Sequence, residues 1–284
     1  QNERDISRKR SRMEVLNLLE GDDEIVDTEA TLISVKDWGQ TWYERERFET
    51  HSIVYYNDLI QLKCKVESGS TVRILQLTDN VICHQGFDIL ATGLKNGNLL
   101  TEIGLIKNLI GRKGIELLSN ILVSNCFLRR LTLCQSQAPS DAWISLFYSL
   151  KVNSSLTTLT IKGEKINTEG TRQLASALMV NSVLEKLILR RVTLGSYGEK
   201  RHLISGLKNN HTLKVIHLTD NKMPHGEFSS LLHAIGDNSS LKELKLQECQ
   251  LGFANIHNVN SLLRDRPCSL QSLDLANNFM RDER

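Results

Sequence analysis

A group of leucines and other apolar residues returns every 28 or 29 residues, and this repeat constrains the fold more than any other feature. In the stretch SSLKELKLQECQL, residues 239–251, Leu241, Leu244 and Leu246 stand three and two positions apart among polar neighbours. The same pattern occurs eight times, and all three positions are apolar in every copy. A repeat of this length indicates a stack of similar supersecondary units. The first positions of the copies are Val72, Leu100, Leu128, Leu156, Leu184, Leu213, Leu241 and Leu270.

The spacing within each copy predicts a strand followed by a helix. Leu244 and Leu246 are two residues apart, so both point to the same side of a strand. Between copies lies a second apolar set with members four apart, such as Leu174 and Leu178, which is the spacing of one helix face. We therefore expect strand and helix in each repeat to turn their apolar sides towards a shared interior.

Glycine or asparagine precedes the first apolar position by three residues in seven of the eight copies, and Pro267 does so in the last. Because glycine and asparagine tolerate left-handed backbone, we expect them to end each helix in that conformation. The seven residues are Gly69, Gly97, Asn125, Asn153, Asn181, Asn210 and Asn238.

The segment LKELKLQECQL matches the pattern L-x-x-L-x-L-x-x-N/C-x-L in full, and VRILQLTDNVI and LKVIHLTDNKM match it with apolar exchanges. On these residues the chain resembles the leucine-rich repeat family, specifically its ribonuclease-inhibitor subtype. It is similar to the repeat regions of nucleotide-binding oligomerisation-domain (NLR-type) receptors. The resemblance implies an α/β fold: a right-handed α/β solenoid (horseshoe) of about eight 28–29-residue repeats, with a concave parallel sheet and outer helices.

In that family the Asn or Cys of the pattern is expected to hydrogen-bond the turn that leaves the strand. The middle repeats instead carry Ser136, Glu164 and Val192 at this position. Valine has no side-chain hydrogen bond to offer, so we expect the central turns to be looser or differently shaped. The matching residues are Asn80, Asn108, Asn221, Cys249 and Asn278.

The two ends of the chain depart from the period. We expect residues 1–69 to form an N-terminal tail and capping segment, and residues 70–284 to form the leucine-rich repeat domain with an incomplete last repeat. The basic run Arg8–Arg12 has two interpretations, a nuclear-import or acidic-surface contact and a solvated tail. Because the chain begins with Gln and only RDER follows the last repeat, we expect a fragment of a longer protein.

The composition and motifs point away from catalysis. The chain is 40% apolar and 24% charged, with a net charge of +2, as in a soluble globular protein. No phosphate loop, H-E-x-x-H or G-x-S-x-G motif occurs, and KDWGQ is one residue short of the D-x-x-G-Q segment of GTPases. The six cysteines include no C-x-x-C pair, and we expect small core residues or inert surface thiols rather than a metal or disulfide framework. We expect no enzyme activity, metal or cofactor, and a cytoplasmic protein, with the nucleus as the alternative.

The resemblance leaves two classes of function. The first is a recognition module that binds a protein partner on the concave face. The second is an enzyme regulator of the Ran GTPase-activating or ribonuclease-inhibitor kind, although the acidic tail of the former and the high cysteine content of the latter are missing. An adaptor for ubiquitin ligation would need an F-box-like helical segment, for which residues 1–30 offer too little.

Residues on either side of the strand leucines should face the concave surface, because side chains alternate along a strand. Within the middle strands Glu243 is the only acid on that face. This indicates a basic stripe for an acidic protein segment, with nucleic acid second and neither membrane nor small molecule expected. The alternative is a solvated face with charges placed by chance. The candidate site residues are Arg130, Lys162, Lys186, Arg190, His217 and Lys245.

Overall fold

The chain divides into two compact units, Gln1–Ala30 and Thr31–Arg284, and everything described here belongs to the second. For residues 31–36, 72, 84 and 96 only the backbone is described. The computed structural model describes residues 31–36, 59–60, 63–64, 66–67, 72–78, 82, 84–96, 99–195, 198–252, 255, 259–260 and 269–279.

Strands and helices alternate along the second unit, as the two apolar spacings predict. The helices are α4 (His84–Asn96), α5 (Gly111–Ser124), α6 (Trp143–Leu150), α7 (Thr168–Val180), α8 (Lys200–Lys208) and α9 (His225–Asp237). The strands of the main sheet are β1 (Thr31–Lys36), β2 (Val72–Thr78), β3 (Glu102–Ile106), β4 (Arg130–Cys134), β5 (Thr158–Lys162), β7 (Lys186–Arg190), β9 (Val215–His217), β10 (Glu243–Lys245) and β11 (Ser272–Asp274).

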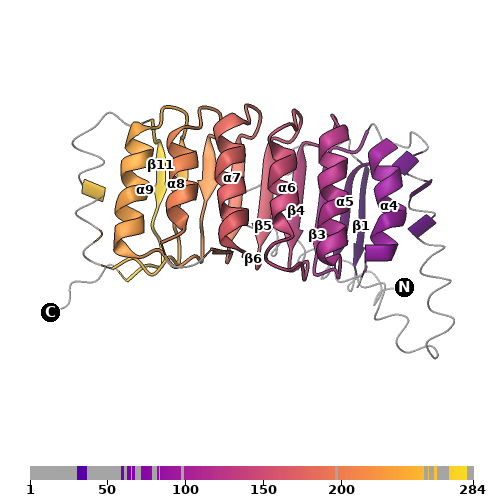
Figure 1. The fold of residues 1–284 in the computed structure, drawn as a ribbon, viewed down its shortest axis with the longest axis horizontal. Coiled ribbons are helices and arrows are strands. Elements are labelled where there is room, and N and C mark those ends of the chain that lie inside the picture. The colour runs from indigo at the N-terminus through magenta and orange to yellow at the C-terminus, as the bar shows by residue number, and fades with distance from the viewer. Residues whose placement is uncertain are drawn as a thin grey trace, which may run out of the picture. The chain divides into compact units, whose positions relative to one another are not determined.

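The main sheet is parallel, and its nine strands follow one another in sequence order. Equivalent positions of successive repeats lie side by side, so that Leu131 is opposite Leu159 and Leu159 is opposite Leu187. The helices form a second layer over one face of the sheet, also in chain order (Figure 1). The predicted alternation of strand and helix around a parallel sheet is confirmed, whereas the horseshoe curvature stays a prediction.

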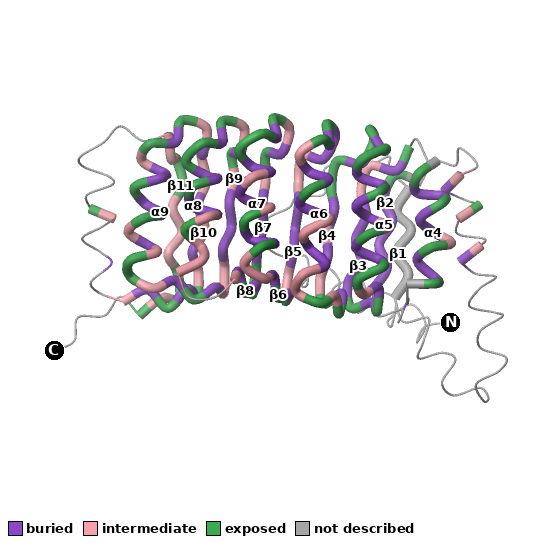
Figure 2. Tube along the Cα trace, viewed as in Figure 1, coloured by how far each residue is buried: buried purple, intermediate pink, exposed green. Residues whose placement is uncertain are grey.

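The core lies between the two layers and consists of the repeat leucines. Leu159 and Leu187 of the sheet and Leu174 of α7 have no exposed surface, and Figure 2 shows buried stretches along α5, α7 and the middle strands of the sheet. Complete burial of one leucine stabilises the fold by about 1.5–3 kcal/mol. In α6, Trp143 and Phe147 are also fully buried, with ring centroids 6.2 Å apart, so both pack in the core.

The helix ends differ from the expectation. Asn125, Asn181 and Asn238 have φ of −86°, −72° and −84°, so these residues are extended and the predicted left-handed conformation is wrong. Their side chains explain the choice of asparagine. Each side chain donates to a carbonyl in the preceding repeat and accepts two N–H groups of its own turn, and glycine offers neither contact.

Five such residues, which we call the asparagine ladder, occur in successive repeats: Asn125, Asn153, Asn181, Asn210 and Asn238. All five are buried. Their Nδ2 atoms lie 2.7–3.2 Å from carbonyl oxygens in the last turn of the preceding helix. Their Oδ1 atoms accept from the N–H groups two and three residues further on. The ladder therefore satisfies helix carbonyls that have no partner within their own helix.

The turns that leave the strands follow the family pattern at both ends of the described stack. Asn108, Asn221 and Asn278 donate to the carbonyls of Leu77, Leu189 and Leu246 at 2.8, 2.6 and 2.8 Å. The thiol of Cys249 reaches the Leu218 carbonyl at 3.1 Å. The hydrogen bond that the resemblance implies is therefore present at these four positions.

The central turns are differently shaped, as expected. After β5 and β7 the chain forms two extra short strands, β6 (Lys165–Ile166) and β8 (Thr193–Leu194), which pair in parallel. The carboxylate of Glu164 accepts the Ser136 N–H at 2.6 Å, and burial raises the pKa of this carboxyl. In these turns a carboxylate and a second small sheet supply the backbone hydrogen bonds that asparagine makes in the other repeats.

Several predictions concern residues outside the described part of the chain. They include the basic run Arg8–Arg12, residues 37–40 of KDWGQ, Asn80, Pro267 and the terminal RDER. The boundary between residues 69 and 70 also stays a prediction, and β1 belongs to the main sheet. None of the described helices has the length and apolar character needed to cross a membrane.

Candidate functional site

The six candidate residues all lie on the same face of the sheet, opposite the strand leucines. The register aligns them in rows: Arg130 and Lys186 share one row, His217 and Lys245 the next, and Lys162 and Arg190 the third. We call this surface the sheet face. Residues between the first and third rows, such as Thr160, belong to it as well.

The middle of the sheet face carries positive charge only. Strands β4, β5 and β7 contain Arg130, Lys162, Lys186 and Arg190, and no acidic residue. Lys162 stands directly opposite Arg190 on the neighbouring strand. Like charges in direct cross-strand register disfavour folding.

Acidic residues flank this region on both sides. Arg130 Nη1 lies 3.3 Å from Glu102 Oε2, and Glu243 Oε1 lies 2.9 Å from His217 Nε2 and 3.6 Å from Lys245 Nζ. The expected basic stripe is therefore interrupted at β10, where one carboxylate contacts two of the six candidates.

The candidates also differ in exposure. The side chain of His217 is only 6% exposed, so it is a buried partner of Glu243, and Lys245 is 15% exposed. Lys162 and Lys186 are half-buried. Arg130, with a side chain 58% exposed, and Arg190 are the accessible members.

The sheet face also has an apolar part, which the pattern of charged residues does not reveal. Ile106 and Ile188 lie in its rows and are 4% and 7% exposed. The alternation that identifies the basic residues also identifies these isoleucines. The centre of the face therefore combines buried apolar side chains with accessible arginines.

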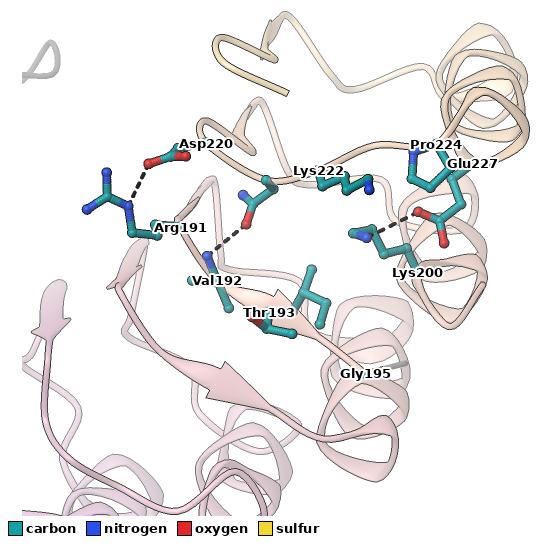
Figure 3. A pocket seen from close by; sticks show the side chains of 11 residues that line it. Arg191, Val192, Thr193, Gly195, Lys200, Asp220, Lys222, Pro224 and Glu227 are labelled. Atoms are coloured by element: carbon teal, nitrogen blue, oxygen red, sulfur yellow. Dashed lines mark hydrogen bonds and ion pairs between the residues drawn. The ribbon is translucent and has the colours of Figure 1, made fainter. Parts of the chain in front are cut away.

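A separate hollow of about 320 Å³ lies between the segment Arg191–Gly195, which includes β8, and the turn that precedes α9 in the next repeat (Figure 3). Two ion pairs at this hollow cross-link adjacent repeats. Arg191 Nε lies 2.7 Å from Asp220 Oδ2, and Lys200 Nζ lies 3.1 Å from Glu227 Oε2. Each of these acids is occupied by a neighbouring base, which suits a structural role.

The described residues contain no cluster of three or more His, Cys, Asp or Glu side chains that could hold a metal ion. Burial raises the pKa of the Cys249 thiol to about 11, so the sulfur stays protonated at neutral pH and is a poor nucleophile. His217 and Glu243 form a pair at 2.9 Å, and Lys245 contacts the same carboxylate.

No protein-family model and no curated protein sequence matches the chain. Among solved structures, it is similar to the leiomodin-1 actin-binding site 2, with a TM-score of 0.47 and 19% identity over 54% of this chain and 88% of that one. It is also similar to the tropomodulin C-terminal domain of Caenorhabditis elegans, with a TM-score of 0.39 and 10% identity over 64% of this chain and 92% of that one. A third similar structure is TLR13 in its complex with ssRNA13, with a TM-score of 0.45 and 19% identity over 76% of this chain and 30% of that one.

The fold itself follows from the geometry of the chain. Parallel strands in sequence order, helices in a second layer and buried leucines at the L-x-x-L-x-L positions recur through the described repeats. The strand-exit asparagines make the contacts that the pattern requires. This is a leucine-rich-repeat type of α/β solenoid.

Proposed function

We propose that this chain is a protein-binding module that takes an acidic segment of its partner on the sheet face, which is the concave face of the expected horseshoe. The observation that carries the proposal is the direct register of Lys162 with Arg190, within three strands that hold four bases and no acid. The proposal assigns the chain no catalytic step.

A carboxylate placed over this region would offset the like-charge pair. Guanidinium groups bind carboxylates with two parallel hydrogen bonds, so Arg130 and Arg190 are suited to fix the register of an acidic segment. Strands in a sheet lie about 4.8 Å apart, so β4 and β7 are about 10 Å apart. Arg130 is aligned with Lys186, four residues before Arg190 on β7, which adds about 13 Å along the strands. A segment with acidic residues about 16 Å apart would therefore reach both arginines.

The flanking acids define the limits of the proposed footprint. Glu102 on β3 and Glu243 on β10 would repel an acidic partner, whereas β4, β5 and β7 attract it. We therefore place the contact on these three strands, with His217 and Lys245 outside it. An enzyme regulator of the Ran GTPase-activating or ribonuclease-inhibitor kind is the alternative, with an enzyme as the partner of the same face.

The test compares two charge reversals, Arg190→Glu on the sheet face and Lys113→Glu on the exposed side of α5. The probe is a fluorescent peptide of ten glutamates, with single-stranded DNA of equal charge as a second probe. We expect Arg190→Glu to weaken peptide binding about fivefold or more, since an accessible charge contributes on the order of 1 kcal/mol. Binding should also weaken as salt increases.

Lys113→Glu should leave the peptide affinity nearly unchanged, because it makes the same change in net charge away from the sheet face. Equal effects of the two reversals would contradict the proposal and indicate non-specific attraction. Tighter binding of the DNA than of the peptide, with the same dependence on Arg190, would assign the face to nucleic acid instead. Circular dichroism of both variants checks that the fold is retained.

A further inference from the structure

Exposed apolar side chains gather at the C-terminal ends of three adjacent helices, α5, α6 and α7, at an edge of the stack separate from the sheet face. They are between 43% and 62% exposed. The equivalent positions of the next two repeats hold Lys208, Asn209 and Asp237. We call this group the helix-end patch, and its members are Val123, Phe127, Tyr148, Val152, Met179 and Val180.

Hydrogen bonds of the asparagine ladder hold the three helix ends side by side. Asn153 Nδ2 donates to the Leu122 carbonyl and Asn181 Nδ2 to the Leu150 carbonyl, both at 2.7 Å. Arg129 Nη1 also reaches across to the Ser155 carbonyl at 3.0 Å. The patch therefore stands on a rigid base, which lowers the entropy cost of binding a partner there.

The surroundings of the patch are basic. The turns between helix and strand, from residue 92 to residue 242, carry six bases and two acids. Both acids are in ion pairs, Glu185 with Lys214 and Asp237 with Lys208, at 2.7 and 3.0 Å. The bases are Lys95, Arg129, Lys151, Lys208, Lys214 and Lys242.

A hollow of about 430 Å³ adjoins the patch on the side of α8. Its lining includes Val183, three residues after Val180, and His211, Lys214 and Lys242 of the following turns, together with Glu185, whose carboxylate is paired with Lys214. A protruding side chain can enter such a hollow, whereas a flat bilayer surface cannot. The shape therefore favours a protein segment over a membrane.

We propose that the helix-end patch docks an amphipathic, acidic helix of a partner protein. Its apolar side chains would cover the patch, and its carboxylates would face the basic rim and the hollow. Large exposed apolar surfaces with polar rims are typical of protein interaction sites, and a helix laid on such a surface binds through residues at i, i+3, i+4 and i+7. This surface is independent of the one proposed on the sheet face.

The chain carries its own reporter for the test. Cys126 is exposed and directly precedes Phe127, while Cys64 is exposed outside the patch. The experiment measures the iodoacetamide alkylation rate of each thiol by peptide mass spectrometry. The probe is a designed helical peptide of about 18 residues, with leucine at the four helix-face positions and glutamate elsewhere. A peptide of the same composition in scrambled order is the control.

At about four times its Kd the amphipathic peptide occupies about 80% of the sites, so alkylation of Cys126 should slow about fivefold. Alkylation of Cys64 should not change. The double variant Val152→Ser, Val180→Ser should raise the Kd about tenfold. The matched variant Leu109→Ser, at an exposed position of the opposite edge, should not, and neither should Arg190→Glu on the sheet face.

Four results would overturn the proposal. The first is protection of Cys126 by the scrambled peptide that equals protection by the amphipathic one, and the second is full protection of the double variant. Alternatively, neither peptide protects Cys126 but vesicles of phosphatidylcholine and phosphatidylserine do, in which case the patch is a lipid-binding surface. A complete lack of protection by peptide and vesicles alike would also refute it.

Discussion

At the edge of the stack where the helices end, asparagine hydrogen-bonds the backbone of the turn in five successive repeats. At the edge where the strands end, the residue at the equivalent position changes in the middle repeats. The ladder from Asn125 to Asn238 keeps the same donor and acceptors throughout. At the strand exits, asparagine gives way to Ser136, Glu164 and Val192, and β6 pairs with β8.

The difference follows from the backbone that each edge must satisfy. At the ends of α5, α7 and α9 the chain leaves the helix through an extended asparagine, so the same side-chain amide fits. At the central strand exits the added strands pair their own backbone groups, as in the bond from Thr193 N–H to the Glu164 carbonyl at 3.0 Å. Where backbone supplies the hydrogen bonds, the side chain is released from that requirement.

The largest expected effect is the loss of one ladder residue. Asn210→Ala removes the bond to the Leu178 carbonyl at 2.7 Å and leaves the N–H groups of Thr212 and Leu213 without their acceptor. Because Asn210 and Leu213 are buried and Thr212 is partly buried, we expect the free energy of unfolding to fall by about 3 kcal/mol. Urea denaturation measures it.

The adjacent Asn209 provides a matched control. It is exposed, and its side chain bonds only the Ser205 carbonyl of its own helix. Asn209→Ala should change the free energy of unfolding by at most about 0.5 kcal/mol. Similar losses for the two variants would show that the ladder has no special role.

A smaller effect is expected when the missing asparagine is restored at the strand-exit edge. Val192 is 3% exposed and packs in the core. If the altered turn has no place for an amide, Val192→Asn should lower the free energy of unfolding by about 2 kcal/mol, because a polar group is buried without partners. Stabilisation in thermal unfolding would instead show that the central turns still accept the family residue.

Glu164 should make the central edge sensitive to pH. Burial raises its pKa above 4.5, the usual value for glutamate. The folded state then binds the proton more tightly than the unfolded state, so this contribution to stability is complete below pH 4.5 and is lost as the pH rises through the raised pKa. The amide of Glu164→Gln does not titrate, so the variant should not lose this stability as the pH rises.

The measurement is urea denaturation at about pH 4 and about pH 7 for Glu164→Gln and for the exposed control Glu116→Gln. Relative to the unmodified protein, Glu164→Gln should gain stability at the higher pH, by up to about 1 kcal/mol. The control should not. A pH-independent difference would mean that the Ser136 hydrogen bond outweighs the cost of burial.

The smallest effect is expected from the ion pair of Arg191 with Asp220, which also joins two repeats at the strand-exit edge. The arginine side chain is 72% exposed. Arg191→Ala should therefore cost no more than about 0.5 kcal/mol. A double-mutant cycle with Asp220→Ala isolates the interaction, and a coupling energy well above this value would place part of the edge's stability in its surface charges.

The sequence predicts the strand–helix order and the buried leucines because their spacing is visible without a structure. It does not distinguish two uses of asparagine, left-handed backbone and side-chain hydrogen bonding, since both select the same residue. That is why the helix ends were predicted in the wrong conformation.

The sheet face shows a similar limit. Alternation is enough to bring Arg130 and Arg190 to one face, but not to reveal that His217 is buried against Glu243, because that contact joins two different repeats. The burial of Thr160, 5% exposed despite facing this side, also depends on its neighbours. By contrast, the apolar residues just before Asn153 and Asn181 could have indicated the helix-end patch.

The asparagine ladder also has a genetic consequence. Each ladder residue contributes its acceptor within its own repeat and its donor to the repeat before, so every repeat presents the same pair of junctions. A tandem duplication of one repeat would therefore insert between its neighbours with every junction of the ladder complete, whereas an insertion of any other length would put the amides out of phase. Variation in the length of such a protein should proceed by whole cassettes of DNA, about 84 base pairs each for a 28-residue period.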